Sequence, residues 1–151
     1  MNHTAKVALC GGILAVLSCA TATTPQLRAF DPSGYFLPTA PLPSRLSNVK
    51  WLELWARDST GAPASLRGSL RVADPASPIG FTNLPIRITS ADSGSLAFEA
   101  LSYPGGSLSF RGHFTRTGIF SELPDNTVAL TGTFATSGLV TDARFTYTVG
   151  D

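Results

Sequence analysis

The strongest constraint on this chain is a strict alternation of apolar and polar side chains in its C-terminal half. Within residues 106–115, the apolar side chains of Phe110 and Phe114 fall on one face and Arg111 falls on the other. Residues 127–135 repeat the pattern. Successive side chains of a β-strand point to opposite faces, so a period of two predicts half-buried strands. The alternation therefore favours a β fold over a helical one.

Further segments bring the expected total to about eight strands. Connections rich in Gly, Pro, Asp, Asn and Ser separate them, and most of these connections are short. Short turns join strands that are neighbours in space, so we expect antiparallel pairing in a meander. The other expected strands lie at residues 33–37, 49–57, 66–72, 85–89, 95–101 and 141–149.

Two of these segments allow a second interpretation. Residues 30–46 contain four prolines, which forbid a helix and permit at most a short edge strand. We expect an extended arm there, with its aromatic side chains packed on the domain. For residues 49–57 a strand is favoured because Trp and Val suit strands, while a helix capped by Asn48 is the alternative.

A recurrent glycine predicts how the sheet is shaped. Gly68, Gly112 and Gly132 each lie between two apolar residues of the same strand face. Inward glycines relieve crowding where a sheet bends sharply, as it does in a barrel. We therefore expect an all-β fold, a single antiparallel meander that closes as an up-and-down barrel, with a two-sheet β-sandwich as the alternative. The expected core consists of Leu70, Val72, Leu96, Phe98, Leu108, Phe110, Phe114, Val128, Leu130, Phe134, Phe145 and Tyr147.

The first residues of the chain predict export. Lys6 precedes an uninterrupted apolar and small-residue run over residues 7–17. This run is too short to cross a bilayer, which takes roughly 20 apolar residues, and it fits a signal peptide. The residues that end at Cys19 resemble a bacterial lipobox, in which an apolar pair and a small residue precede a lipidated cysteine. Cleavage after Ala22 is the alternative, and it would release a secreted soluble protein.

Cysteine usage favours the lipid anchor. Cys10 lies inside the apolar run, so Cys19 would be the one cysteine of the exported chain and could form no internal disulfide. Acyl chains such as palmitate on Cys19 would remove the free thiol and hold the protein in a membrane of the bacterial envelope. The expected organisation is a signal peptide over residues 1–18, the lipidated Cys19 and a tether over 19–29, and a barrel domain with an N-terminal proline-rich arm over 30–151.

Composition and motifs exclude several functions. Charged residues make up 14% of the chain, and without Lys6 ten basic residues remain against ten acidic ones. That balance gives no basic surface for nucleic acid. His113 is the one histidine after the signal peptide, and a metal site needs several ligands. The S-x-x-K pattern of Ser47 and Lys50 stands without companion motifs. We therefore expect no enzyme, no cofactor and no metal.

A few residues are candidates for a ligand or partner surface. Trp51 and Trp55 share one face of the strand at 49–57 and flank Glu53, so they could line a pocket mouth or a docking surface, or pack beneath the arm. The connection 116–126 carries Ile119 and Phe120, which could form a lid or plug the barrel end. Tyr147 is the one polar side chain expected to point inward.

The pattern as a whole has a resemblance. A lipobox at Cys19, a polar tether, the start Asp31-Pro32-Ser33-Gly34-Tyr35 and repeated strands with Gly between Leu or Phe resemble small bacterial envelope lipoproteins with a lipocalin- or avidin-like barrel. The resemblance covers most of the exported chain and carries over no ligand residue. It leaves two expected functions: a non-catalytic structural or interaction module with an envelope protein as partner, or a carrier of one small apolar ligand such as an acyl chain. The apolar inward residues favour the filled module.

Overall fold

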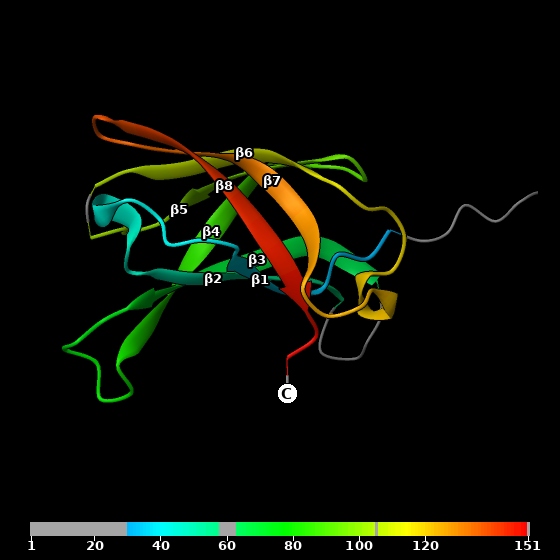
Figure 1. The fold of residues 1–151 in the computed structure, drawn as a ribbon, viewed down its shortest axis with the longest axis horizontal. Helices are drawn as coiled ribbons and strands as arrows, with labels where there is room; N and C mark the ends of the chain where they lie inside the picture. Colours follow the sequence, from blue (N-terminus) through cyan, green and yellow to red (C-terminus); the bar gives the residue numbers. More distant parts are fainter. Residues whose placement is uncertain (1–29, 58–62, 105, 151) are drawn as a thin grey trace, which may run out of the picture.

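The computed structural model describes residues 30–57, 63–104 and 106–150, and these form eight antiparallel strands that close into a barrel in chain order (Figure 1). The expected all-β meander is confirmed. The sandwich alternative is wrong, because β8 returns to pair with β1. The expected signal peptide, Cys19, the tether and Ala22 lie outside the described residues. The strands are β1 Gly34–Pro38, β2 Val49–Arg57, β3 Pro63–Ala73, β4 Phe81–Ala91, β5 Ser95–Ala100, β6 Leu108–Phe114, β7 Thr127–Thr136 and β8 Leu139–Thr148, with the 3-10 turns η1 Ser44–Leu46 and η2 Phe120–Glu122.

The proline-rich arm contributes a full member of the barrel. β1 is paired on both sides, with β2 through Phe36 and Leu52 and with β8 through Phe36 and Tyr147. The expectation of at most an edge strand was therefore wrong. The reason is placement: Pro32 precedes the strand and Pro38 is its last residue, so no proline interrupts the ladder.

Strand β4 is longer than the sequence suggested, because Pro85 lies in its middle rather than at its start. The carbonyl oxygen of Pro85 accepts a hydrogen bond of 3.0 Å from the backbone N–H of Leu101, just beyond the end of β5. In an antiparallel strand the N–H and C=O of one residue point to the same neighbour. A residue other than proline at position 85 would therefore direct its N–H toward β5 and not toward β3. For this reason Pro85 removes no hydrogen bond from the β3–β4 pairing, in which it lies opposite Ser69.

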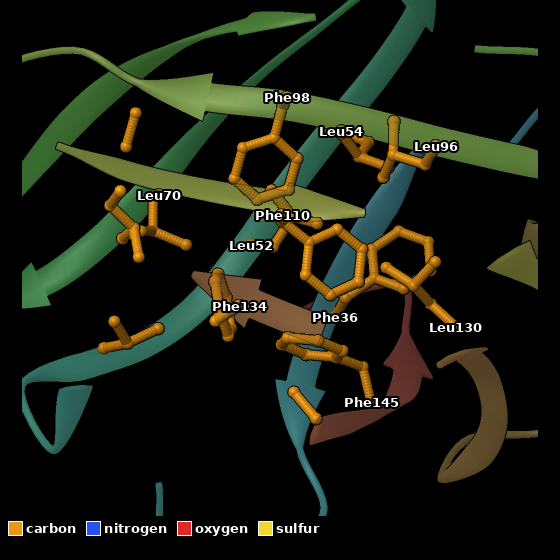
Figure 2. Close-up of a cluster of buried hydrophobic side chains, with 14 of the residues drawn as sticks. Phe36, Leu52, Leu54, Leu70, Leu96, Phe98, Phe110, Leu130, Phe134 and Phe145 are labelled. Atoms are coloured by element: carbon orange, nitrogen blue, oxygen red, sulfur yellow. The ribbon is translucent and has the colours of Figure 1, made fainter. Parts of the chain in front are cut away.

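The barrel interior is filled by large side chains. Figure 2 shows the phenylalanine rings and leucines of opposite strands pointing toward one another. The Phe110 ring centroid lies 5.3 Å from that of Phe98, 5.1 Å from Phe134 and 5.8 Å from Phe145. These separations are those of rings in contact, so the aromatic side chains occupy the space that a ligand would need.

The expected core is confirmed except at Val128, which is half-buried. The pairing of β7 with β8 shifts register between Val128 and Leu130. An extra residue in one strand turns the following side chains to the other face. As a result Ala129 and Leu130 are both buried, although they are adjacent.

The glycines of β6 and β7 make room for the central ring of the core. Gly112 and Gly132 pair with each other, and a Cβ on either residue would lie 2.6 Å from Cζ of Phe110. The same Cβ atoms would lie 2.3 Å from backbone carbonyl oxygens of the neighbouring strand. The inward glycines expected at a bend are thus required by close approach of ring and backbone.

Both ends of the barrel are closed by short turns, which Figure 1 shows at opposite ends of the molecule. At one end η1 buries Leu46, and the hydroxyl oxygen of Tyr103 lies 2.7 Å from both the carbonyl oxygen of Arg45 and Oδ1 of Asn48. At the other end η2 buries Phe120. Residues of the chain itself therefore close the barrel on each side of the aromatic core.

Replacing Gly132 with alanine should lower the free energy of unfolding by about 2 kcal/mol or more, because the added Cβ meets backbone atoms that cannot turn aside. Gly94→Ala is the matched control, since its Cβ would lie at an ordinary 3.5 Å from Asp92. Urea unfolding of both variants measures the difference. Equal stability of the two variants would contradict the close packing at Gly132.

Candidate functional site

The expected site residues do not come together in one place. Trp51 and Trp55 lie half-buried on the outer wall of β2, while Leu52 and Leu54 point into the core. Phe120 and Tyr147 are buried inside the η2 end, and Ile119 lies beside them, half-buried. The strand interpretation of residues 49–57 is confirmed, and the helix alternative is wrong.

The residues at the η2 end serve the fold. The Phe120 ring packs 5.6 Å from Phe114, 6.0 Å from Phe36 and 5.6 Å from Tyr147. The backbone N–H of Phe120 donates to the carbonyl oxygen of Asp31 at 2.9 Å, which ties the turn to the start of the barrel. Phe120 is therefore placed as a plug.

The inward hydroxyl of Tyr147 is also used within the fold. Tyr147 donates a hydrogen bond of 2.9 Å to the carbonyl oxygen of Ser33. Burial raises the pKa of Tyr147, and the negative charges of Asp31 and Asp125 add to that effect. Its donor is committed to the backbone, so it offers no polar anchor for a ligand inside the barrel.

The outer wall carries an aromatic patch, which we define as Tyr35, Trp51 and Phe81 together with Arg71. The ring centroid of Trp51 lies 6.2 Å from Tyr35 and 6.2 Å from Phe81. The guanidinium carbon of Arg71 lies 4.4 Å from the centre of the Trp51 ring and 4.0 Å from that of Phe81. Both distances are within the range of cation–π contacts.

Strand register explains why Trp51 and Arg71 meet. Trp51 is directly opposite Arg71 in the β2–β3 pair, and Arg71 is opposite Asn83 in the β3–β4 pair. Directly opposed side chains on one face of a sheet are close enough to interact. The Nε–H of Arg71 accordingly donates to Oδ1 of Asn83 at 2.7 Å, which holds the guanidinium on the rings.

A surface hollow of about 400 Å³ adjoins the aromatic patch and crosses the junction where the barrel closes. The barrel wall on either side of that junction supplies its lining. Those lining residues are Tyr35, Leu37, Trp51, Arg71, Thr148 and Gly150. Leu37 is more than a third exposed, so the hollow offers apolar surface to solvent next to a cation.

Trp51 carries a polar group that the fold does not use. Its indole Nε1 is buried and has no hydrogen-bond partner among the described residues. A buried donor without an acceptor costs roughly 1–3 kcal/mol, and such groups are rare in native proteins. Local rules of this kind are broken most often at functional sites. This singles out Trp51 from the other outward residues.

Other outward residues show ordinary surface roles. Glu53 accepts a hydrogen bond of 3.4 Å from the Ser69 hydroxyl. His113 is exposed, with Nε2 3.0 Å from the Thr131 hydroxyl oxygen, as expected for a solvated residue. The hydroxyl of Ser47 is exposed and donates to the carbonyl oxygen of Ser44 at 2.8 Å.

No cluster of three His, Cys, Asp or Glu side chains is placed to hold a metal ion in the described part of the chain. No helix within the described ranges is long and apolar enough to span a membrane.

Comparison with known proteins adds no relative. The chain matches no protein-family model, and no curated protein or solved structure is detectably similar to it.

Sequence reasoning singled out Trp51 and missed its partners. Arg71 falls within the expected strand at 66–72 and is not among the candidate residues, and Phe81 falls outside the expected strand at 85–89. Their convergence depends on the register of three strands, which no local pattern specifies. A Trp opposite an Arg on the solvent faces of consecutive strands is the signal that could have found them.

Replacing Phe120 with alanine should lower the free energy of unfolding by about 3–5 kcal/mol, because the ring leaves a cavity among Phe36, Phe114 and Tyr147. Ser121→Ala, at an exposed position of the same turn, is the control. Thermal or urea unfolding gives the comparison. A loss similar to that of the control would argue for a loosely held lid instead of a plug.

Proposed function

We propose that this chain is an exported lipoprotein of the bacterial envelope, anchored through Cys19, and that its barrel is a non-catalytic interaction module. The partner surface we assign to it is the aromatic patch on the outer wall. The proposal rests on two features seen together: the interior of the barrel is filled by its own side chains, and its outer wall carries the aromatic patch with Arg71.

The filled interior favours the module over the carrier. An eight-stranded barrel is just wide enough to be filled by its own side chains or to hold one small ligand. Here the rings of Phe98, Phe110 and Phe134 contact one another across the space, with centroid separations of 5.1 to 6.3 Å. A carrier would need those rings to leave the interior, and no observation favours that alternative.

The closed sheet restricts how a partner can dock. Each strand has a paired neighbour on both sides, so none of the eight described strands is an edge strand of an open sheet. This arrangement favours recognition through side chains on the outer wall. Tyr, Trp and Arg are enriched at protein interfaces and at the residues that carry most binding energy. The aromatic patch has that composition.

The wider assignment extends the resemblance seen in the sequence. Lipocalin- and avidin-like proteins share the eight-stranded up-and-down barrel. We assign the chain to small envelope lipoproteins of that kind on the combined grounds of the barrel and the lipobox-like residues before Cys19. The absence of any nucleophile–base motif in the sequence supports a non-catalytic role. Release as a soluble protein after Ala22 is the competing outcome.

Replacing Cys19 with alanine should shift the protein from the membrane fraction to the soluble exported fraction, since stable anchoring depends on acyl chains attached there. Cell fractionation with an antibody to the barrel measures the shift. Cys10→Ala, within the expected signal peptide, is the matched control and should leave the distribution unchanged. Membrane association that persists in Cys19→Ala would contradict the lipid anchor.

The barrel domain purified from its host, without the anchor, should show the mass of the polypeptide alone by native mass spectrometry. The reason is that the aromatic core leaves no room for a guest. A hydrophobic dye that reports apolar cavities should likewise remain dark. A bound lipid present at one molecule per chain would contradict the interaction module and support the function as a carrier.

A further inference from the structure

Arg71 is fixed on the aromatic patch in a way that leaves one edge of its guanidinium unused. Its guanidinium carbon lies over the rings of Trp51 and Phe81, and its Nε–H is bonded to Asn83. Within the described part of the chain, Nη1 and Nη2 have no hydrogen-bond partner, and no carboxylate pairs with the group. Arg87, by contrast, is paired with Glu99 on a neighbouring stretch of wall.

The unused edge has a specific chemistry. Nη1 and Nη2 present parallel N–H donors that match the two oxygens of a carboxylate, a bidentate arrangement that a lysine cannot reproduce. The guanidinium is already held by two rings and one amide, so little side-chain freedom remains to be lost on binding. Arg71 is thus prepared to receive an acid.

The neighbouring hollow indicates which chemical group of the ligand should lie next to its carboxylate. Tyr35, Leu37 and Trp51 line it with ring and aliphatic surface, and Arg71 lies at its border as the one cation of the lining. One guanidinium balances the single charge of a carboxylate, whereas a phosphate carries nearly two charges at neutral pH. A second cation is disfavoured because Arg71 already occupies the faces of Trp51 and Phe81.

We propose that the aromatic patch binds a peptide segment of a partner protein in which a carboxylate stands next to a large apolar side chain, as at a carboxyl terminus that ends in an aromatic residue. The carboxylate lies on the Nη edge of Arg71, and the apolar side chain lies in the hollow against Tyr35 and Leu37. This inference rests on the proposed function, because it names the chemistry of the partner.

The test uses two probes that differ only in charge: N-acetyl-tryptophan and its amide. NMR titration of the isotope-labelled exported chain should show shifts at Trp51 and Tyr35, with the acid binding about tenfold more tightly than the amide, as one charge-assisted bidentate contact implies. Arg71→Gln should bring the two affinities together, because it removes both the charge and the fork, and Arg71→Lys, which keeps the charge without the fork, should narrow the difference. Arg67→Gln, on the same strand and exposed, is the matched control and should preserve the difference.

Three outcomes would overturn the inference: equal affinity for the acid and the amide, no binding of either probe, or a preference that survives Arg71→Gln in a variant that unfolds like the parent. A second measurement separates this failure from that of the proposed function. A photo-cross-linking residue in place of Leu37 should capture an envelope protein in cells, while the same residue at the exposed Val140 should not. Specific capture that is unaffected by Arg71→Gln would support the docking surface of the proposed function. It would contradict only the proposal that the partner binds through a carboxylate.

Discussion

The structure depends on the insertion of one short strand, β1, between the two ends of the sheet. Phe36 of β1 pairs with Leu52 of β2 on one side and with Tyr147 of β8 on the other. Closure also requires Gly34, because a Cβ there would lie 2.4 Å from the Tyr147 ring, and its φ of +143° is one that side chains disfavour. Without β1 both β2 and β8 would become free edges of an open sheet.

The same strand links the core to the proposed docking surface. Phe36 points inward and contacts Phe114 and Phe120, whereas the preceding residue, Tyr35, points outward and contacts Trp51. The hollow beside the aromatic patch therefore lies over the junction that closes the barrel. A partner bound there would contact β8, β1, β2 and β3 at once, and binding would stabilise the closed form over an open sheet.

Local sequence patterns predicted the parts of this fold that depend on local physics. Alternation identified β6 and β7 as strands and gave the correct faces of β6 and of β7 from Leu130 onward, and the glycines at 68, 112 and 132 indicated a closed sheet, because both signals arise within a single strand. The patterns failed where pairing decides the outcome. Val128 was misassigned because a bulge opposite β8 reverses its face, and the role of Pro85 depends on how far β5 extends. The partners of Trp51 were missed for the same reason, since only register places Arg71 and Phe81 beside it.

Successive side chains of each strand point alternately into the barrel and out of it. Residues that stabilise the core are therefore different from those available for the proposed recognition. Trp51 and Leu52 are neighbours in the chain, yet Leu52 is fully buried in the core while Trp51 belongs to the patch. Outward positions of β1, β2 and β3 can therefore change without altering the packing of the interior. If the barrel acts as the proposed interaction module, sequence change on its wall is limited by solubility and by contact with the proposed partner. The indole N–H of Trp51 is buried without an acceptor among the described residues, which lowers the stability of the fold. Among the outward-facing residues, Trp51 is therefore the one whose placement stability accounts for least.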